Sequence, residues 1–235
     1  FYQATTVEPM GLRSRRRIIT RDRTVTHIED EDLADPTAVS ADAAARADAE
    51  MVACAGDASP YAFGSEDATL ASALLEECRA RGRTLAVAES CTGGIVGGML
   101  TAVAGSSDVF LGGWITYSNE MKSAQLGVDP QLIARHGAVS RETVLAMAAG
   151  ACARSGATLA VSVSGVAGPG GGSAEKPVGT VWIAVHDAVS GTGRARRFEY
   201  PGMRDIVRDR TAKTALQMAR WMLRGEDAAI LWERT

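Results

Sequence analysis

Residues 84–98 read Thr84-Leu-Ala-Val-Ala-Glu-Ser90-Cys-Thr-Gly-Gly-Ile-Val-Gly-Gly98, and the fold is organised around this stretch. Its apolar run from Leu85 to Ala88 is typical of a buried strand. The run stops at a polar turn that begins with Glu89 and Ser90, and two glycines and a second apolar run follow. The pattern predicts a strand, a tight turn and a helix.

The polar turn supports three interpretations. In the first, Ser90 and Thr92 only cap the helix that follows. In the second, the helix N-terminus binds an anion such as a phosphate, although neither G-x-G-x-x-G nor the P-loop pattern is present. In the third, Ser90 is an exposed nucleophile. The third interpretation requires a base, oxyanion donors and a substrate anchor from the rest of the chain.

The composition restricts the class of protein. The chain has 235 residues, of which 46% are hydrophobic, which allows one sizeable domain with extensions. A net charge of −3 and a pI near 5.7 argue against a nucleic-acid partner. The 4 cysteines lack metal or disulfide spacing and the 3 histidines are far apart, so we expect no metal and no cofactor. No apolar run is long enough to span a bilayer and no secretory signal is visible, so we expect a cytoplasmic protein without a membrane partner.

Three segments are expected along the chain. Residues 1–66 contain a basic cluster at Arg13–Arg17, an acidic cluster at Glu29–Asp32 and few apolar residues, so they are predicted to be a low-complexity, flexible N-terminal extension. Residues 67–225 are predicted to form the folded domain. Residues 226–235 are predicted to be a C-terminal tail.

Glycines and capping residues divide the domain into elements. Helices are predicted at residues 70–82, 118–127, 129–137, 140–155 and 205–223, and strands at 85–88, 109–117, 157–163, 179–186 and 194–200. Because strands first alternate with helices and then form a hairpin, the sequence predicts an α/β fold, a layered mixed β-sheet flanked by helices. Ser90, Tyr117 and Ser164 fall at ends of predicted strands, where such sheets bind ligands, and this favours the nucleophile interpretation.

Seven motifs follow one another between residues 67 and 224. They are Ala88-Glu-Ser-Cys-Thr-Gly-Gly94, Gly113-Trp-Ile-Thr-Tyr-Ser-Asn119, Leu126-Gly-Val128 preceded by Lys122, Gly137-Ala-Val-Ser140, Ser164-Gly-Val-Ala-Gly-Pro-Gly170, Lys176-Pro-Val-Gly-Thr-Val181, and a helix with Arg204 and Arg208. Together they resemble the CinA C-terminal domain family. Its enzymatic members are nicotinamide-nucleotide amidases, which hydrolyse nicotinamide mononucleotide (NMN) to nicotinate mononucleotide and ammonia. The name also covers competence- and damage-associated proteins with a larger N-terminal domain, which we do not expect the short, polar first 65 residues to form.

The chemistry that the resemblance implies requires a nucleophile and a base. Ser90 is the expected nucleophile because it lies at the strand end, whereas Cys91 suits packing at the start of the helix. The resemblance points to Ser90 as well. Lys122 is the expected base, since a desolvated lysine near other cations can lose its proton, and the resemblance implies the same residue.

Other residues remain open for these roles. Lys176, His136 and His186 are the alternative bases. Tyr117 either relays a proton, orients Lys122 or packs as an ordinary tyrosine at a strand end.

The remaining expected site residues bind the substrate. Backbone N–H groups after Ser90 and in the loop at 168–172 are expected to stabilise the oxyanion. Arg204 and Arg208 share a helix face at i, i+4 and are expected to bind a phosphate; local ion pairs with Asp205 and Asp209 are the alternative. The full substrate-binding set is Thr92, Gly93, Gly94, Asn119, Ser164, Gly165, Gly168, Gly170, Arg204 and Arg208.

Two residues depart from the family pattern. Ser164 stands where the family usually has Thr, which keeps a hydroxyl, and Met203 stands where it usually has Asp, which removes a helix-capping carboxylate. The resulting hypothesis is an NMN amidase that acts through Ser90 and Lys122 on a small-molecule nucleotide substrate, with homo-oligomer formation left open. The alternative is a non-catalytic nucleotide-binding or regulatory module of the CinA type.

Overall fold

The computed structural model describes residues 69–228, 230 and 232–234, together with four short strands nearer the N-terminus. These strands are β1 (Thr6–Val7), β2 (Ser14–Arg15), β3 (Arg17–Ile19) and β4 (Val25–His27). β1 pairs antiparallel with β2, and β3 pairs antiparallel with β4. The other residues of the extension expected at 1–66 lie outside the described residues. Phe1–Ala68 and Thr69–Thr235 form two separate units.

A six-stranded mixed sheet forms the centre of the second unit, in the order β10-β9-β8-β7-β5-β6. Its strands are β5 (Leu85–Glu89), β6 (Phe110–Ile115), β7 (Leu159–Gly165), β8 (Thr180–Asp187), β9 (Thr192–Glu199) and β10 (Glu233–Arg234). β5 pairs parallel with both β6 and β7, whereas β7, β8, β9 and β10 pair antiparallel in succession. The predicted mixed sheet of an α/β fold is therefore confirmed.

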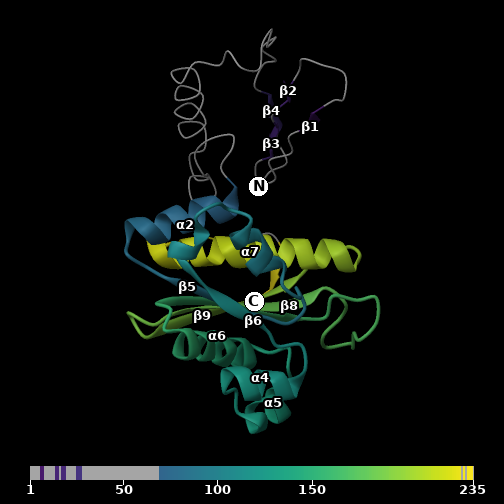
Figure 1. Cartoon of the computed structure of the whole chain (residues 1–235). Coiled ribbons are helices and arrows are strands. Elements are labelled where there is room, and N and C mark those ends of the chain that lie inside the picture. The colour runs from purple at the N-terminus through teal and green to yellow at the C-terminus, as the bar shows by residue number, and fades with distance from the viewer. Residues whose placement is uncertain are drawn as a thin grey trace. The chain divides into compact units, whose positions relative to one another are not determined.

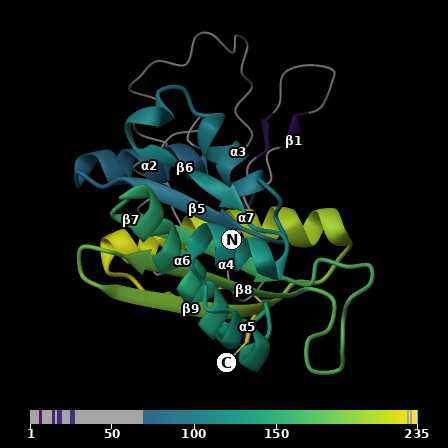
Figure 2. The ribbon, with the colours of Figure 1, turned by 60° about the horizontal axis from the view of Figure 1, so that its bottom comes forward.

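Helices cover both faces of this sheet (Figure 1). One face is covered by three helices that pack together, α2 (Leu70–Ala80), α3 (Ile95–Thr101) and the long α7 (Arg204–Arg224). The short helix η2 (Ser106–Asp108) connects α3 to β6. α6 (Arg141–Ser155) packs on the other face, and α4 (Asn119–Leu126) and α5 (Pro130–His136) pack against α6 (Figure 2). No helix in the described part of the chain combines the length and the apolarity that crossing a membrane would require.

β5 lies at the centre of the core. All five of its residues are buried. Leu85 and Val87 pack in the cluster beneath α2, α3 and α7, while Ala86 and Ala88 pack in the cluster that contains residues of α4, α5 and α6. A strand covered on both faces requires a continuous apolar run instead of alternation. The apolar run before Ser90 meets that requirement. Because the strand is fixed by packing on both faces, the turn that follows it has a fixed position at the edge of the core.

α4 and α6 begin and end at the capping residues expected from the sequence. Ser140 accepts a hydrogen bond from Thr143 N–H at the start of α6, and Gly156, with a φ of 74°, ends it. Ser118 caps α4 in the same way and Gly127, with a φ of 72°, ends it. A positive φ at the residue after a helix favours glycine. These boundaries place α4 directly after the end of β6.

Within the segment expected to be a C-terminal tail at residues 226–235, Glu233 and Arg234 add a strand to the sheet. β10 pairs with β9 as the edge strand. The centroid of the Trp232 ring lies 5.9 Å from that of the Tyr200 ring. The Arg210 guanidinium lies 4.3 Å from the centroid of the Trp232 ring. The sequence pattern missed this strand because its two residues are charged and show no apolar alternation.

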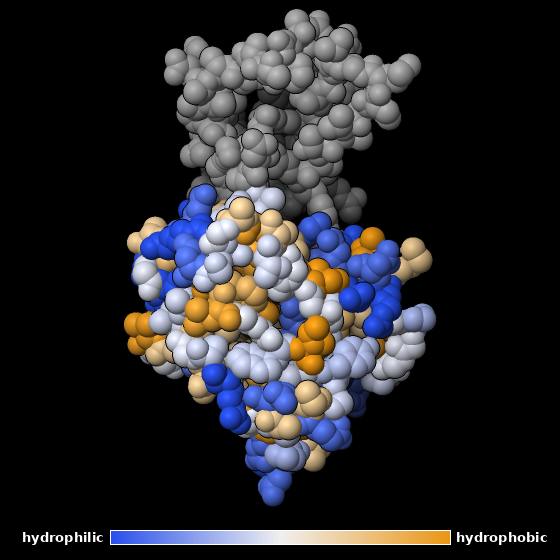
Figure 3. All heavy atoms as spheres, in the orientation of Figure 1, coloured by the Kyte–Doolittle hydropathy of each residue, from blue (hydrophilic) through white to orange (hydrophobic). Residues whose placement is uncertain are grey.

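Apolar surface concentrates near the opposite edge of the sheet. Leu111 and Ile115 of β6 are 48% and 56% exposed, and Tyr117 and Met121, just beyond the strand, are 62% and 41% exposed. Figure 3 shows apolar residues as separate patches among hydrophilic ones on the face that Figure 1 presents. The end of β6 is thus an apolar region that leads to Tyr117.

The contact of α6 with α4 gives a test of the packing. A Cβ built on Gly150 of α6 would lie 2.1 Å from the backbone oxygen of Leu126 in α4. We expect Gly150→Ala to lower the free energy of unfolding by about 1–3 kcal/mol, because the helices must separate to admit the methyl group. Urea unfolding measures this. Gly98→Ala on α3, where nothing lies within 4 Å, is the control and should be neutral or stabilise by up to about 1 kcal/mol. Equal effects of the two substitutions would contradict the close packing of α4 on α6.

Candidate active site

The turn after β5 presents Ser90 at the end of the strand. Ser90 N–H donates to the carbonyl of Val163 in β7 at 3.1 Å, and Gly93 N–H donates back to the carbonyl of Ser90 at 3.2 Å. Gly94, with a φ of 100°, begins α3 in a left-handed conformation that favours glycine. Ser90 is buried, and its position is therefore set by the sheet on one side and by a closed turn on the other.

Glu89 caps α3, a role that one of the three interpretations from the sequence gave to Ser90 and Thr92. Its Oε2 accepts from Gly94 N–H at 2.9 Å and from Val96 N–H at 3.2 Å, and its Oε1 accepts from Gly97 N–H at 2.8 Å. The N-cap residue Gly94 makes no side-chain cap. Both the capping interpretation and the anion-binding interpretation of this turn are thus wrong, because a carboxylate of the chain occupies the helix N-terminus. A buried acid directly before a glycine-rich turn is the signal that could have revealed it.

The side chain of Lys122 extends from α4 to the Ser90 turn. Its Nζ lies 3.2 Å from Ser90 Oγ and donates to the carbonyl of Thr116 at 2.8 Å. The carbonyls of Tyr117 and Ser118 lie 3.4 and 3.5 Å away. Lys122 is only 1% exposed. The amine therefore sits in an enclosed setting where Ser90 is its one side-chain hydrogen-bond partner among the described residues.

Burial affects the pKa values of Lys122 and Cys91 in opposite directions. Desolvation lowers the pKa of the Lys122 amine below its usual value of 10.5, because the ammonium form loses its hydration. Desolvation raises the pKa of the Cys91 thiol to about 12. A thiol with this pKa holds almost no thiolate near neutral pH, which makes Cys91 a poor nucleophile. Ser90 thus has a nearby amine that releases its proton more readily than an ordinary lysine.

A cavity of about 180 Å³ opens beside these groups. Six of the residues that line it were expected at the site from the sequence: Ser90, Lys122, Tyr117, Ser164, Gly165 and Arg204. The other lining residues were not expected at the site from the sequence; they are Cys91, Ala138, Val139 and Ala167. Ala138 and Val139 belong to the Gly137–Ser140 motif, which was noted only as part of the resemblance.

Seven expected substrate-binding residues do not line the cavity. They are Thr92, Gly93, Gly94, Asn119, Gly168, Gly170 and Arg208. Thr92 is fully buried, Asn119 is exposed at the start of α4, and Gly170 is exposed in the loop after β7. Fewer residues line the cavity than the motifs suggested. Several of the other motif residues instead set the backbone conformation around it.

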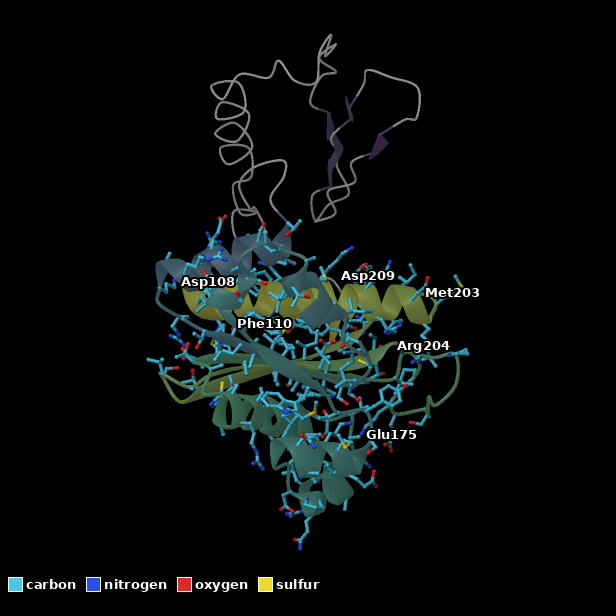
Figure 4. All side chains as sticks on the ribbon, viewed as in Figure 1. Asp108, Phe110, Glu175, Met203, Arg204 and Asp209 are labelled. Atoms are coloured by element: carbon cyan, nitrogen blue, oxygen red, sulfur yellow. The ribbon has the colours of Figure 1, made fainter. Side chains whose placement is uncertain are left out.

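The two arginines at the start of α7 have different partners. Arg208 Nε donates to the carbonyl of Cys91 at 3.1 Å and its Nη2 to the carbonyl of Thr92 at 2.7 Å, so this side chain holds the Ser90 turn. Arg204 is exposed and lines the cavity. It lies beside Met203 at the end of α7 that is labelled in Figure 4. The two arginines therefore do not act together as expected: Arg204 lines the cavity, whereas Arg208 contacts the backbone of the Ser90 turn.

Arg204 joins two further parts of the cavity rim. Its Nη1 donates to the carbonyl of Gly168 at 2.8 Å and its Nη2 to the hydroxyl of Tyr117 at 3.2 Å. The Tyr117 hydroxyl thus faces Arg204, whereas the group of Tyr117 near Lys122 is its backbone carbonyl. This arrangement does not support a proton relay through the Tyr117 hydroxyl. The alternative ion pair of Asp209 forms with Lys213, at 2.9 Å, and not with either arginine.

The other candidate bases have separate partners. Lys176 Nζ donates to the carbonyl of His136 at 3.3 Å, at the C-terminal end of α5. His136 Nδ1 lies 3.6 Å from Glu142 Oε2. His186 is in β8, opposite Gly193 of β9. None of the three lines the cavity, so within the described residues Lys122 is the candidate base that reaches Ser90.

Hydrogen-bond donors and acceptors complete the cavity wall. Ser164 is 1% exposed and its Oγ donates to the carbonyl of Ala138 at 2.8 Å. In the part of the chain that the structure describes, neither Cys91 N–H nor Ala167 N–H donates to a backbone carbonyl. Both N–H groups belong to buried residues that line the cavity.

Among the residues that the structure describes, no group of three or more His, Cys, Asp or Glu side chains is placed to hold a metal ion.

Solved structures with this fold are known. Competence/damage inducible protein CihA from Agrobacterium tumefaciens is 44% identical, with a TM-score of 0.63 over 66% of this chain and 93% of that one. The CinA superfamily protein KP700603 from Klebsiella pneumoniae is 33% identical, with a TM-score of 0.64 over 66% of this chain and 96% of that one. The α/β architecture is thus shared with CinA superfamily structures.

Curated relatives match the same part of the chain. A CinA-like protein of Gemmatimonas aurantiaca is 48% identical over 174 residues, which cover 73% of this chain and 40% of that protein. A putative competence-damage inducible protein of Moorella thermoacetica is 44% identical over 166 residues, which cover 71% of this chain and 40% of that protein. The chain therefore spans about 40% of the length of these relatives.

Two family models match the chain. One, described as the N-terminal domain of DNA helicase IV HelD, matches residues 1–49. The other, described as the CinA C-terminal domain, matches residues 67–223, which is more than half of the chain and includes every residue of the cavity. The chain belongs to the CinA C-terminal domain family.

Proposed function

We propose that this protein hydrolyses the carboxamide of NMN to nicotinate mononucleotide and ammonia, with Ser90 as nucleophile and Lys122 as base. The observation that carries the proposal is the 3.2 Å separation of Lys122 Nζ and Ser90 Oγ beside the cavity. A hydroxyl is a weak nucleophile unless a base lies within hydrogen-bond reach. The lowered pKa of Lys122 supports its role as that base.

The first chemical step forms an ester with Ser90. Lys122 Nζ accepts the hydroxyl proton while Ser90 Oγ attacks the carboxamide carbon. The tetrahedral intermediate then expels its nitrogen, which takes the proton from Lys122 and leaves as ammonia. A water molecule attacks the ester in the second step, with Lys122 again accepting a proton and returning it to Ser90 Oγ. Atoms and charges balance without a cofactor.

Backbone donors near Ser90 can stabilise the oxyanion. Cys91 and Ala167 are buried residues that line the cavity, and in the described part of the chain neither of their N–H groups donates to a backbone carbonyl. Donors that are fixed before the reaction stabilise the developing charge without reorganisation. Ala167 thereby replaces the later glycines of the 168–172 loop as the proposed donor from that side.

Arg204 is the proposed anchor for the 5′-phosphate. It is a cation that lines the cavity, and its exposed position at the rim suits the end of a substrate that remains outside. Its contacts with Gly168 and Tyr117 restrict the position of the guanidinium. An arginine binds phosphate with charge-assisted hydrogen bonds of fixed geometry.

One observation favours a second candidate function. Three backbone carbonyls lie within 2.8 to 3.5 Å of Lys122 Nζ, and such acceptors stabilise the ammonium form, which cannot act as a base. A protein in which Lys122 remains charged would bind a nucleotide without hydrolysing it. Calorimetric titration with NMN, combined with an ammonia assay, separates the two: binding without ammonia release indicates the non-catalytic module.

Substitutions at the reactive pair test the chemistry. Ser90→Ala should retain NMN binding and lose kcat by several orders of magnitude, because the covalent step is lost. Lys122→Arg should lower kcat by about 10²–10⁴-fold, since arginine stays protonated. Ammonia release measures both. Cys91→Ala and Lys176→Met are the controls and should keep most of the activity. Activity in Ser90→Ala together with its loss in Cys91→Ala would replace the mechanism by a thiol amidase.

The pH dependence of stability tests the state of Lys122. Its pKa is lowered in the folded protein, so between that pKa and 10.5 the unfolded state binds more protons. Stability contributed by this group therefore rises with pH across that window and is absent below it. Wild type should thus gain free energy of unfolding relative to Lys122→Met as the pH increases toward 10.5 in urea titrations. A difference that stays constant or declines over this range would show that the amine is charged in the folded protein.

Removal of the anchor tests the substrate. Arg204→Ala should lower kcat/KM for NMN by about tenfold or more, because a charge-assisted contact contributes roughly 1.5–3 kcal/mol. For nicotinamide riboside, which lacks the phosphate, kcat/KM should be nearly the same in Arg204→Ala as in wild type. Lys213→Ala removes a positive charge from the same helix and should change neither value. Equal losses on NMN and the riboside would rule out the phosphate contact.

A further inference from the structure

Glu89 is a buried ionisable residue that the proposed reaction does not use. It is 2% exposed and is the last residue of β5, directly before Ser90. Its carboxylate accepts three backbone N–H groups, from Gly94, Val96 and Gly97, at 2.8 to 3.2 Å. A carboxylate without such partners would be costly to bury. Its contacts therefore tie the end of β5 to the first turn of α3 across the turn that contains Ser90.

Arg208 holds the same turn from the other side. It donates to the carbonyls of Cys91 and Thr92, while Glu89 accepts from the N–H groups that follow. The Ser90 turn thus lies between a negative side chain that binds its donors and a positive side chain that binds its acceptors. Neither side chain lines the cavity, so both act on the turn and not on a ligand.

We infer that Glu89 is a positioning residue whose carboxylate fixes the Ser90 turn and thereby the approach of Ser90 Oγ to Lys122 Nζ. Both carboxylate oxygens are engaged, Oε2 by two N–H groups and Oε1 by one. A glutamine has one acceptor oxygen, and its amide nitrogen would face an N–H donor. The turn would have to shift, and displacements of about 1 Å can reduce a reaction rate by about 100-fold.

This inference rests on the proposed function in that Ser90 is taken as the nucleophile, but it does not require NMN as the substrate. Two readouts keep the claims apart. The first is kcat and KM for ammonia release from NMN. The second is the rate at which a small alkyl fluorophosphonate modifies Ser90, followed by the mass of the intact protein and mapped by peptide analysis. The fluorophosphonate reports the reactivity of the hydroxyl whatever the natural substrate is.

The matched variants are Glu89→Gln and Glu77→Gln. Glu77 on α2 also carries a partly buried carboxylate, but it accepts from a side chain of α7, Arg220, through Nε and Nη2 at 3.0 and 2.8 Å, and not from the backbone that follows Ser90. Both substitutions replace one oxygen by nitrogen and both should lower Tm. Only Glu89→Gln should slow Ser90 modification and lower kcat, each by about tenfold or more, with KM within about twofold of wild type.

Each outcome decides the inference. Unchanged kcat and modification rate in Glu89→Gln, or equal losses in both variants that follow their losses in Tm, would overturn it, as would a wild-type Ser90 that the probe does not modify. If wild type releases no ammonia from NMN but Glu89→Gln still slows modification, the proposed function fails and the positioning role stands. If Glu89→Gln does not fold, Glu89→Asp keeps the charge on a side chain one methylene shorter; a smaller loss of modification rate supports the role and a wild-type rate overturns it.

Discussion

The burial of the Lys122 amine is the constraint on which the rest of the site depends. A lysine that is 1% exposed must find partners inside the protein, and it finds them in Ser90 Oγ and in backbone carbonyls at the end of β6. Those partners are in place only if β5 and β6 end side by side and α4 begins at once after β6. The absence of a side chain at Gly150 lets α6 press α4 against this edge.

The charged residues around the cavity divide into two groups by what they contact. Glu89 accepts hydrogen bonds from backbone N–H groups and Arg208 donates to backbone carbonyls, so these two residues define the shape of the turn. Lys122 and Arg204 line the cavity. The N-terminus of α3 already holds a carboxylate, whereas the start of α7 has an exposed arginine and no side-chain cap at Met203, and the proposed phosphate contact is therefore placed at α7.

The sequence predicted the elements well where local physics decides them. Glycines with positive φ and Ser caps ended and began α4 and α6 as expected, because these signals act within a single turn. Ser90 and Lys122 were predicted as a pair, and the structure brings them together. The partners of Arg208 could not be predicted, since Cys91 and Thr92 are far from it in the sequence and only the folded domain brings them together. The partners of Glu89 follow it within the same turn and α3, so the acid before the glycine-rich turn was a local signal that was missed. β10 was missed because its two charged residues pair through their backbone, which leaves no pattern in the side chains.

The length of α7 has a consequence for how this domain can vary. Its later turns are anchored in the core through Ala215, Leu216 and Ala219, while its first turns carry Arg204 and Arg208. Each residue of an α-helix adds about 100° of rotation. One residue inserted between the two parts would swing both guanidiniums, and the buried Val207 between them, to another side of the helix while the later turns kept their place in the core. α7 therefore fixes an angular phase between core and cavity, and changes in chain length belong in loops such as 168–178.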